Sequence, residues 1–80
     1  MSREEAFERI NKVFREVFDD ESITVTDSTT ANDIDDWDSF EHINLVVAVE
    51  EEFGIRIPMG KVLVMKNVGE MIDIITEMEK

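Results

Sequence analysis

Three stretches of this chain repeat apolar residues at steps of three and four, which is the spacing of one face of an α-helix. They cover about residues 3–18, 38–53 and 67–79. Their apolar positions are Phe7, Ile10, Val13, Phe14, Val17 and Phe18 in the first, Ile43, Val46, Val47 and Phe53 in the second, with Glu50 its one polar member, and Val68, Met71, Ile72, Ile75 and Met78 in the third. Helices with such stripes are stable when they bury them against one another, so the pattern predicts an all-α fold.

Each predicted helix begins with a polar residue that is followed three positions later by Glu. These pairs are Ser2 and Glu5, Asp38 and Glu41, and Asn67 and Glu70. The spacing is typical of a capping box, in which side chains satisfy the free amides of the first turn. Gly54 is suited to the left-handed end of the second helix, and Pro58 prevents that helix from continuing.

The segments between these helices complete the predicted fold. Residues 19–37 form a long polar connection, whose apolar residues are expected to pin it across the bundle: Ile23, Val25, Ile34 and Trp37. Trp37 precedes the second cap, where it can form a hydrophobic staple. One helical turn is expected over 29–33 and a short helix over 59–65. We therefore expect a single domain over 1–80, a four-helix bundle with three main helices, one short helix and a long loop between helices 1 and 2.

The charge of the chain is strongly acidic and unevenly distributed. Net charge is −12, and no Lys or Arg lies between Arg15 and Arg56, where thirteen Asp or Glu fall. Such a field repels nucleic acid and anionic membranes, and it favours partners with basic surfaces. The amino terminus has no apolar stretch typical of a signal peptide, and no apolar run is long enough to span a bilayer. We expect a cytoplasmic monomer that neither binds nucleic acid nor inserts into a membrane.

Two features of the composition limit the chemistry. A chain of 80 residues buries only roughly 60% of its unfolded surface, which leaves little room for a deep active site. There is no cysteine, so disulfides and thiolate metal sites are excluded. Any thioester chemistry therefore needs a thiol from a prosthetic group.

The sequence Trp37-Asp38-Ser39-Phe40-Glu41-His42-Ile43 opens the second predicted helix. Serine and aspartate are common caps, and an Asp-Ser pair alone is most often structural. Here Asp38 provides the cap, so the Ser39 hydroxyl is not needed for it. A phosphodiester on Ser39 would lie near free amides and the positive end of the helix dipole.

With this motif, the Glu-Glu-Glu-Phe-Gly sequence at 50–54, the Ile-Pro pair at 57–58 and the final helix, the chain resembles an acyl carrier protein over nearly its whole length. The resemblance implies a non-catalytic carrier. A phosphopantetheinyl transferase would attach 4'-phosphopantetheine from coenzyme A to Ser39, and the arm would hold an acyl group as a thioester. The chain departs from the family where Phe40 replaces leucine, Asp36 replaces glycine and Asn44 replaces an acidic residue.

The same resemblance implies a partner-recognition surface along the second helix, formed by Asp38, Phe40, Glu41, Glu50 and Glu51. Its partners would be the transferase, an acyl- or aminoacyl-loading ligase, and synthases and transferases with basic docking surfaces. The cargo stays open: a fatty acyl chain, a polyketide unit, an amino acid or a sugar-modifying group. An interior that shelters the acyl chain is a further implication.

The same residues allow other interpretations. An aminoacyl or peptidyl carrier of a specialised pathway and an unmodified acidic adaptor are alternatives to an acyl carrier. A hydrolase using Ser39 and His42 lacks a glycine-rich elbow, so His42 is expected at the surface near the arm. The acidic run from Asp33 to Asp38 does not fit a calcium loop, because its sixth and twelfth positions are Asp38 and Asn44 instead of Gly and Glu. No metal site is expected.

The thirteen carboxylates between Arg15 and Arg56 predict a salt-dependent stability. Their mutual repulsion opposes folding, and ions screen it. Sodium chloride or magnesium chloride added at pH 7 is expected to raise the melting temperature, measured by circular dichroism. A melting temperature that stays constant or falls with added salt would contradict this prediction.

Overall fold

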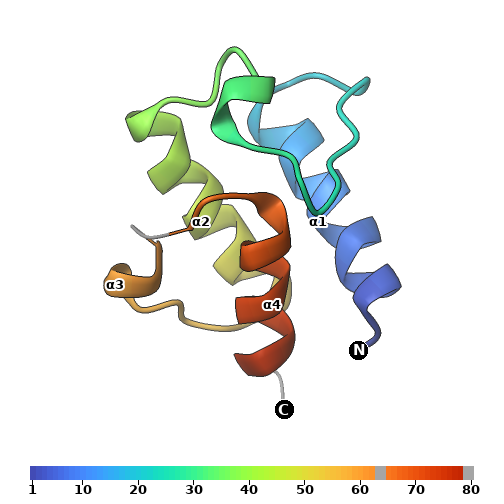
Figure 1. The fold of residues 1–80 in the computed structure, drawn as a ribbon, viewed down its shortest axis with the longest axis vertical. Helices are drawn as coiled ribbons and strands as arrows, with labels where there is room; N and C mark the ends of the chain where they lie inside the picture. The colour runs from blue at the N-terminus through green and yellow to red at the C-terminus, as the bar shows by residue number, and fades with distance from the viewer. Residues whose placement is uncertain (63–64, 79–80) are drawn as a thin grey trace.

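The computed structural model describes residues 1–62 and 65–78. Its elements are α1 (Arg3–Val17), the 3₁₀ turn η1 (Ala31–Asp33), α2 (Ser39–Phe53), α3 (Met59–Val62) and α4 (Val68–Met78). Helix α1 packs against both α2 and α4, the short helix α3 lies at the lower left of the view, and the loop carrying η1 runs over one end of the bundle (Figure 1). Within the described residues there is no strand, and no helix is long and apolar enough to cross a membrane.

The predicted all-α bundle with one short helix and one long loop is confirmed. The helical turn expected over 29–33 is η1. The short helix expected over 59–65 is found as Met59–Val62, and its predicted positions 63–64 lie outside the described residues, as does position 79 of the last helix.

The predicted helix caps are also found. Each cap side chain accepts a hydrogen bond from the third helical amide: Glu5 N–H to Ser2 Oγ at 3.1 Å, Glu41 N–H to Asp38 Oδ1 at 2.8 Å and Glu70 N–H to Asn67 Oδ1 at 2.9 Å. Gly54 ends α2 with φ of 64°, in the left-handed region that favours glycine. The helix boundaries are therefore set by local hydrogen bonding.

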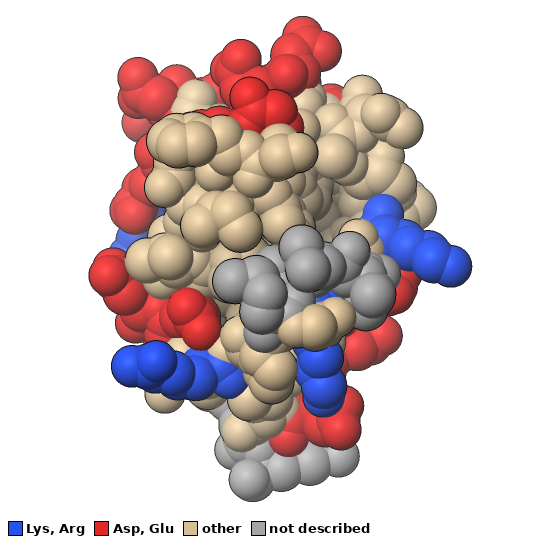
Figure 2. Space-filling model, turned by 90° about the vertical axis from the view of Figure 1, so that its left-hand side faces the viewer, with Lys and Arg blue, Asp and Glu red and all other residues tan. Residues whose placement is uncertain are grey.

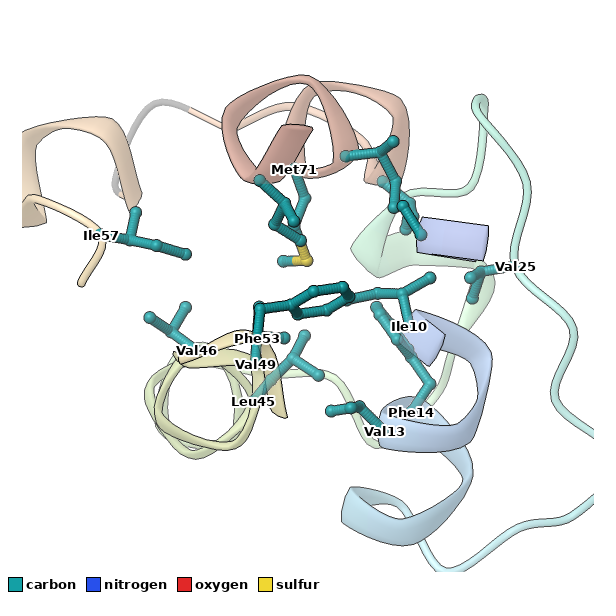
Figure 3. Packing of buried hydrophobic residues seen from close by; sticks show 14 of the residues in the cluster. Ile10, Val13, Phe14, Val25, Leu45, Val46, Val49, Phe53, Ile57 and Met71 are labelled. Atoms are coloured by element: carbon teal, nitrogen blue, oxygen red, sulfur yellow. The ribbon is translucent and has the colours of Figure 1, made fainter. Parts of the chain in front are cut away.

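One core joins the three long helices. In Figure 3, Ile10 and Phe14 from α1, Leu45 and Phe53 from α2, and Met71 from α4 converge in it. On α2 the predicted stripe was wrong at Ile43 and Val47, which are 42% and 49% exposed. The buried face of α2 is instead Leu45, Val46, Val49 and Phe53. Helix α2 has apolar residues on most of its circumference, so periodicity alone could not select the face that α1 covers.

The long loop is held against this core as predicted. Val25 is buried, and Ile23, Ile34 and Trp37 pack partly buried against the cluster. Polar side chains of α1 add to this, because Asn11 Oδ1 accepts the Val25 N–H at 2.6 Å and Arg15 donates to the Ile23 carbonyl at 2.7 Å. At Asp20, bonds from the hydroxyl and N–H of Ser22 hold the carboxyl pKa below its usual value.

The loop is also fastened to the start of α4. The first amides of α4 donate to it, Val68 N–H to the Thr29 carbonyl at 2.9 Å and Gly69 N–H to the Asp27 carbonyl at 3.0 Å. Arg3 donates to the carboxylates of Asp27 and, at 2.6 Å, Asp73, and these bonds raise the pKa of its guanidinium. The start of α1, the long loop and the start of α4, which are distant in sequence, thus meet at residues 27–29 of the loop.

This close approach requires a glycine at position 69. A Cβ there would lie 2.8 Å from both the backbone and a carboxylate oxygen of Asp27. We expect Gly69→Ala to lower the free energy of unfolding by about 1–3 kcal/mol, the usual effect of overpacking. Chemical denaturation measures it.

Gly60→Ala is the matched control, since a Cβ on Gly60 in α3 meets nothing within 4 Å. That variant is expected to change the unfolding free energy by less than about 1 kcal/mol in either direction. Equal effects of the two substitutions would contradict the steric explanation.

Candidate functional site

Ser39 is the first residue of α2 and is exposed. Asp38 before it is extended, with φ of −109° and ψ of −174°, and its carboxylate caps the helix. In the part of the chain that the structure describes, the Ser39 hydroxyl has no hydrogen-bond partner. The hydroxyl is therefore available to solvent, while the carboxylate that precedes it is fixed.

The backbone at this point favours an anion. The N–H groups of Ser39 and Phe40 have no acceptor among the described residues, as expected for the first amides of a helix. The next amides are used, since Glu41 N–H donates to the Asp38 carboxylate and His42 N–H to the Asp38 carbonyl at 2.8 Å. A negative group on Ser39 Oγ would meet free donors and the positive end of the helix dipole.

Trp37 and His42 fix the entry of the loop into α2. The Trp37 Nε1–H donates to His42 Nδ1 at 3.0 Å, and the two rings stack with centroids 5.9 Å apart. Trp37 also contacts Phe14 of α1. The two rings form a T-shaped pair with centroids 5.2 Å apart. The staple position predicted for Trp37 is confirmed. His42, expected near the surface, is partly exposed and partly covered by Trp37, whose packed indole needs an acceptor for its N–H.

A cavity of about 490 Å³ opens beside Ser39. It lies between the start of α2 and the segment that leads into α4. Its wall includes Trp37, Ser39, His42, Ile43, Lys66 and Met71. An arm attached to Ser39 would therefore have a partly apolar groove beside its point of attachment.

The outer face of α2 is largely apolar. Phe40 is 74% exposed, and Ile43 and Val47 follow it on the same face of the helix. Figure 2 shows the side of the molecule that α2 and α3 occupy, with acidic side chains along its upper and left edges, basic and acidic ones mixed below and at the right, and an uncharged area in the upper half. Sequence reasoning selected Phe40 but assigned Ile43 and Val47 to the core. Their spacing from Phe40, at three and seven residues, was the signal that could have found them.

The predicted acidic members of this surface differ in their availability. Glu51 is exposed. Glu41 is half-buried and accepts a bond from Asn44 Nδ2 at 3.1 Å. Glu50 is half-buried too, and its Oε2 accepts the Ile57 N–H at 2.7 Å, so it holds the connection after α2. The carboxylate of Asp38 is engaged in the cap. Within the described residues, no group of three or more Asp, Glu or His is placed to hold a metal ion.

Comparisons with known proteins agree with this geometry. The chain is 35% identical to the acyl carrier protein of Acidothermus cellulolyticus, over 94% of this chain and 89% of that one. It is 39% identical to the putative mitochondrial acyl carrier protein of Schizosaccharomyces pombe, over 96% and 70% of the two chains. The solution structure of a holo acyl carrier protein from Geobacter metallireducens superposes with a TM-score of 0.87 and is 40% identical, covering 92% of this chain and 85% of that one. No protein-family model matches the chain.

An all-helical bundle with a free serine at a capped helix start is the architecture of a small carrier domain. The chain belongs to the acyl carrier protein family. The family and the function of an acyl carrier that the sequence indicates are thereby confirmed.

Proposed function

We propose that Ser39 is the attachment residue for 4'-phosphopantetheine and that the chain presents thioester-bound acyl groups to partner enzymes. The single observation that carries the proposal is the exposed Ser39 hydroxyl beside a cap that Asp38 already provides. In the transfer, Ser39 Oγ bonds to the phosphorus that bears the pantetheine. The pyrophosphate bond of coenzyme A breaks and its nucleotide leaves.

The residues around Ser39 fit this group. The free N–H groups of Ser39 and Phe40 can donate to a phosphodiester, and the groove beside them can accommodate the first part of an arm. The terminal thiol supplies the thioester chemistry that a chain without cysteine lacks. The holo form of the Geobacter metallireducens relative supports the same conclusion.

The chain itself performs no catalysis in this proposal. A hydrolase would need His42 as a general base for Ser39, yet His42 Nδ1 already accepts the Trp37 N–H. The contact has a clear structural purpose, because it fixes the loop that leads into the cap. We further propose a cytoplasmic location and monomeric action.

Partner enzymes are proposed to dock on α2. Phe40, Ile43 and Val47 offer apolar contact area, and Glu41 and Glu51 lie on the same helix. The phosphopantetheinyl transferase, loading ligases, and synthases or transferases with basic rims are the proposed partners. A net charge of −12 supports electrostatic steering toward such rims.

The attachment residue is tested by Ser39→Ala. Because the hydroxyl makes no bond to the described residues, the unfolding free energy is expected to change by no more than about 0.5 kcal/mol. Loading by a promiscuous transferase with coenzyme A is expected to be lost completely, measured by intact mass. Peptide mass spectrometry of the wild-type chain then locates the group. An adduct on Ser2, Ser22 or Ser28, or none at all, would refute the assignment.

The docking surface is tested by Glu41→Lys/Glu51→Lys. Glu50 is left unchanged, because its bond to the Ile57 N–H gives it a structural role. The double variant is expected to slow modification by the transferase at low salt by about tenfold or more, mainly through the association rate, and the difference is expected to shrink as salt rises.

Glu8→Lys/Glu16→Lys is the matched control, with the same change of net charge on the exposed face of α1. Its modification rate is expected to stay closer to the wild-type rate. Equal slowing by both pairs would show that net charge, and not α2, governs the encounter.

A further inference from the structure

Among the described residues that line the cavity beside Ser39, Lys66 is the one Lys or Arg. It lies in the segment that leads from α3 into α4, and Ser39 lies at the start of α2, so the cavity brings together two distant parts of the sequence. The Lys66 side chain is exposed. In residues 1–62 and 65–78 its ammonium has no ion-pair partner. An unpaired cation in a chain of net charge −12 is placed beside the proposed attachment residue.

The polar groups near Lys66 are held by backbone amides. Asp38 lines the same cavity, and its carboxylate accepts the Glu41 N–H. A Glu70 carboxylate oxygen accepts the backbone N–H of Lys66 itself at 3.3 Å, and Asn67 Oδ1 accepts the Glu70 N–H. The first amides of α4 are also used, because they donate to the long loop. Among the described residues on this side of the cavity, the Lys66 ammonium is the cationic group left to meet a new anion, and the Asn67 side-chain amide is a neutral donor next to it in the sequence.

We propose that Lys66 binds the phosphodiester on Ser39 from across the cavity and so holds the first part of the arm in the groove. The inference rests on the proposed function. A phosphodiester carries a permanent negative charge next to Ser39 Oγ. The amides of Ser39 and Phe40 would meet it from α2, and Lys66 would meet it as a point charge on a flexible stem from the segment that leads into α4. Because Lys66 and Ser39 line the same cavity, the proposed contact is with the phosphodiester next to Ser39 and not with the cargo end of the arm.

The proposal has a measurable consequence for stability. Attachment adds one negative group to an already acidic molecule, and general repulsion opposes that. A contact with Lys66 offsets the repulsion in the holo chain only. Removing the ammonium should therefore lower the melting temperature of the holo chain more than that of the apo chain.

The experiment compares apo and holo forms of four chains: wild type, Lys66→Gln, Lys66→Arg and Lys61→Gln. Lys61 is an exposed lysine on α3 that does not line the cavity, so its variant makes the same charge change elsewhere. Intact mass first establishes complete loading of each holo chain. Melting temperatures are then measured at low and high salt. The ³¹P resonance of each holo chain gives a second readout at the phosphodiester itself.

For Lys66→Gln we expect a larger loss of melting temperature in the holo than in the apo form, together with a shifted ³¹P resonance. Both differences should shrink at high salt, and Lys66→Arg should restore most of them. Lys61→Gln should lower both forms equally and leave the ³¹P resonance unchanged. Loaded chains in which the two glutamine variants behave alike would overturn the inference and leave the proposed function intact. Failure of the wild-type chain to load at Ser39 would overturn both.

Discussion

The position of Ser39 depends on the contact between Trp37 and Phe14. The indole ring makes a T-shaped contact with a fully buried ring of α1, while its N–H donates to His42 in the first turn of α2. A single side chain therefore joins the long loop to two helices, directly before the cap. Because aromatic contacts of this kind contribute about 0.5–1.5 kcal/mol beyond burial, the loop enters α2 in a defined direction. Asp38 can then cap the helix, and Ser39 is left at the surface.

The long loop has a second function, which is to define the groove beside that serine. Its backbone accepts the first amides of α4 through Asp27 and Thr29, and Gly69 allows the approach. This fastening sets the start of α4, and with it Lys66 and Met71 on the wall of the cavity. In a chain of 80 residues with a modest core, polar bonds from a loop thus help to position the groove beside the proposed attachment residue.

Helix α2 divides its residues between the core and the surface proposed for partner recognition. Leu45, Val46, Val49 and Phe53 are buried, and Arg9 of α1 lies over the Phe53 ring while it pairs with Glu52 at 2.8 Å. The opposite face carries Phe40, Ile43 and Val47. A protein that binds several partners in succession benefits from apolar surface that stays exposed after folding, because each partner can contact it in turn. Glu41 and Glu50 are half-buried, so they belong fully to neither the buried nor the exposed face.

Much of the fold was predictable because the helices and their ends are set by interactions between residues close together in the sequence. The cap side chains of Ser2, Asp38 and Asn67 and the left-handed Gly54 act within one turn of the backbone, so spacing in the sequence identifies them. The packing of Trp37 against the core was predictable from its position before a cap. The buried face of α2 was not. Its apolar residues surround the helix, and Ile43 and Val47 could be distinguished from Leu45 and Val49 only by where α1 and α4 lie.

The sequence by itself determined the helices, their ends, the pinned loop and a serine next to a cap, since each depends on residues a few positions apart. Only the tertiary structure decided which face of α2 is buried, that His42 accepts the Trp37 N–H, that Glu50 holds the Ile57 amide, and that Lys66 shares a cavity with Ser39. These arrangements follow from the relative placement of whole elements. That placement is set by the sum of many core contacts and not by any local pattern.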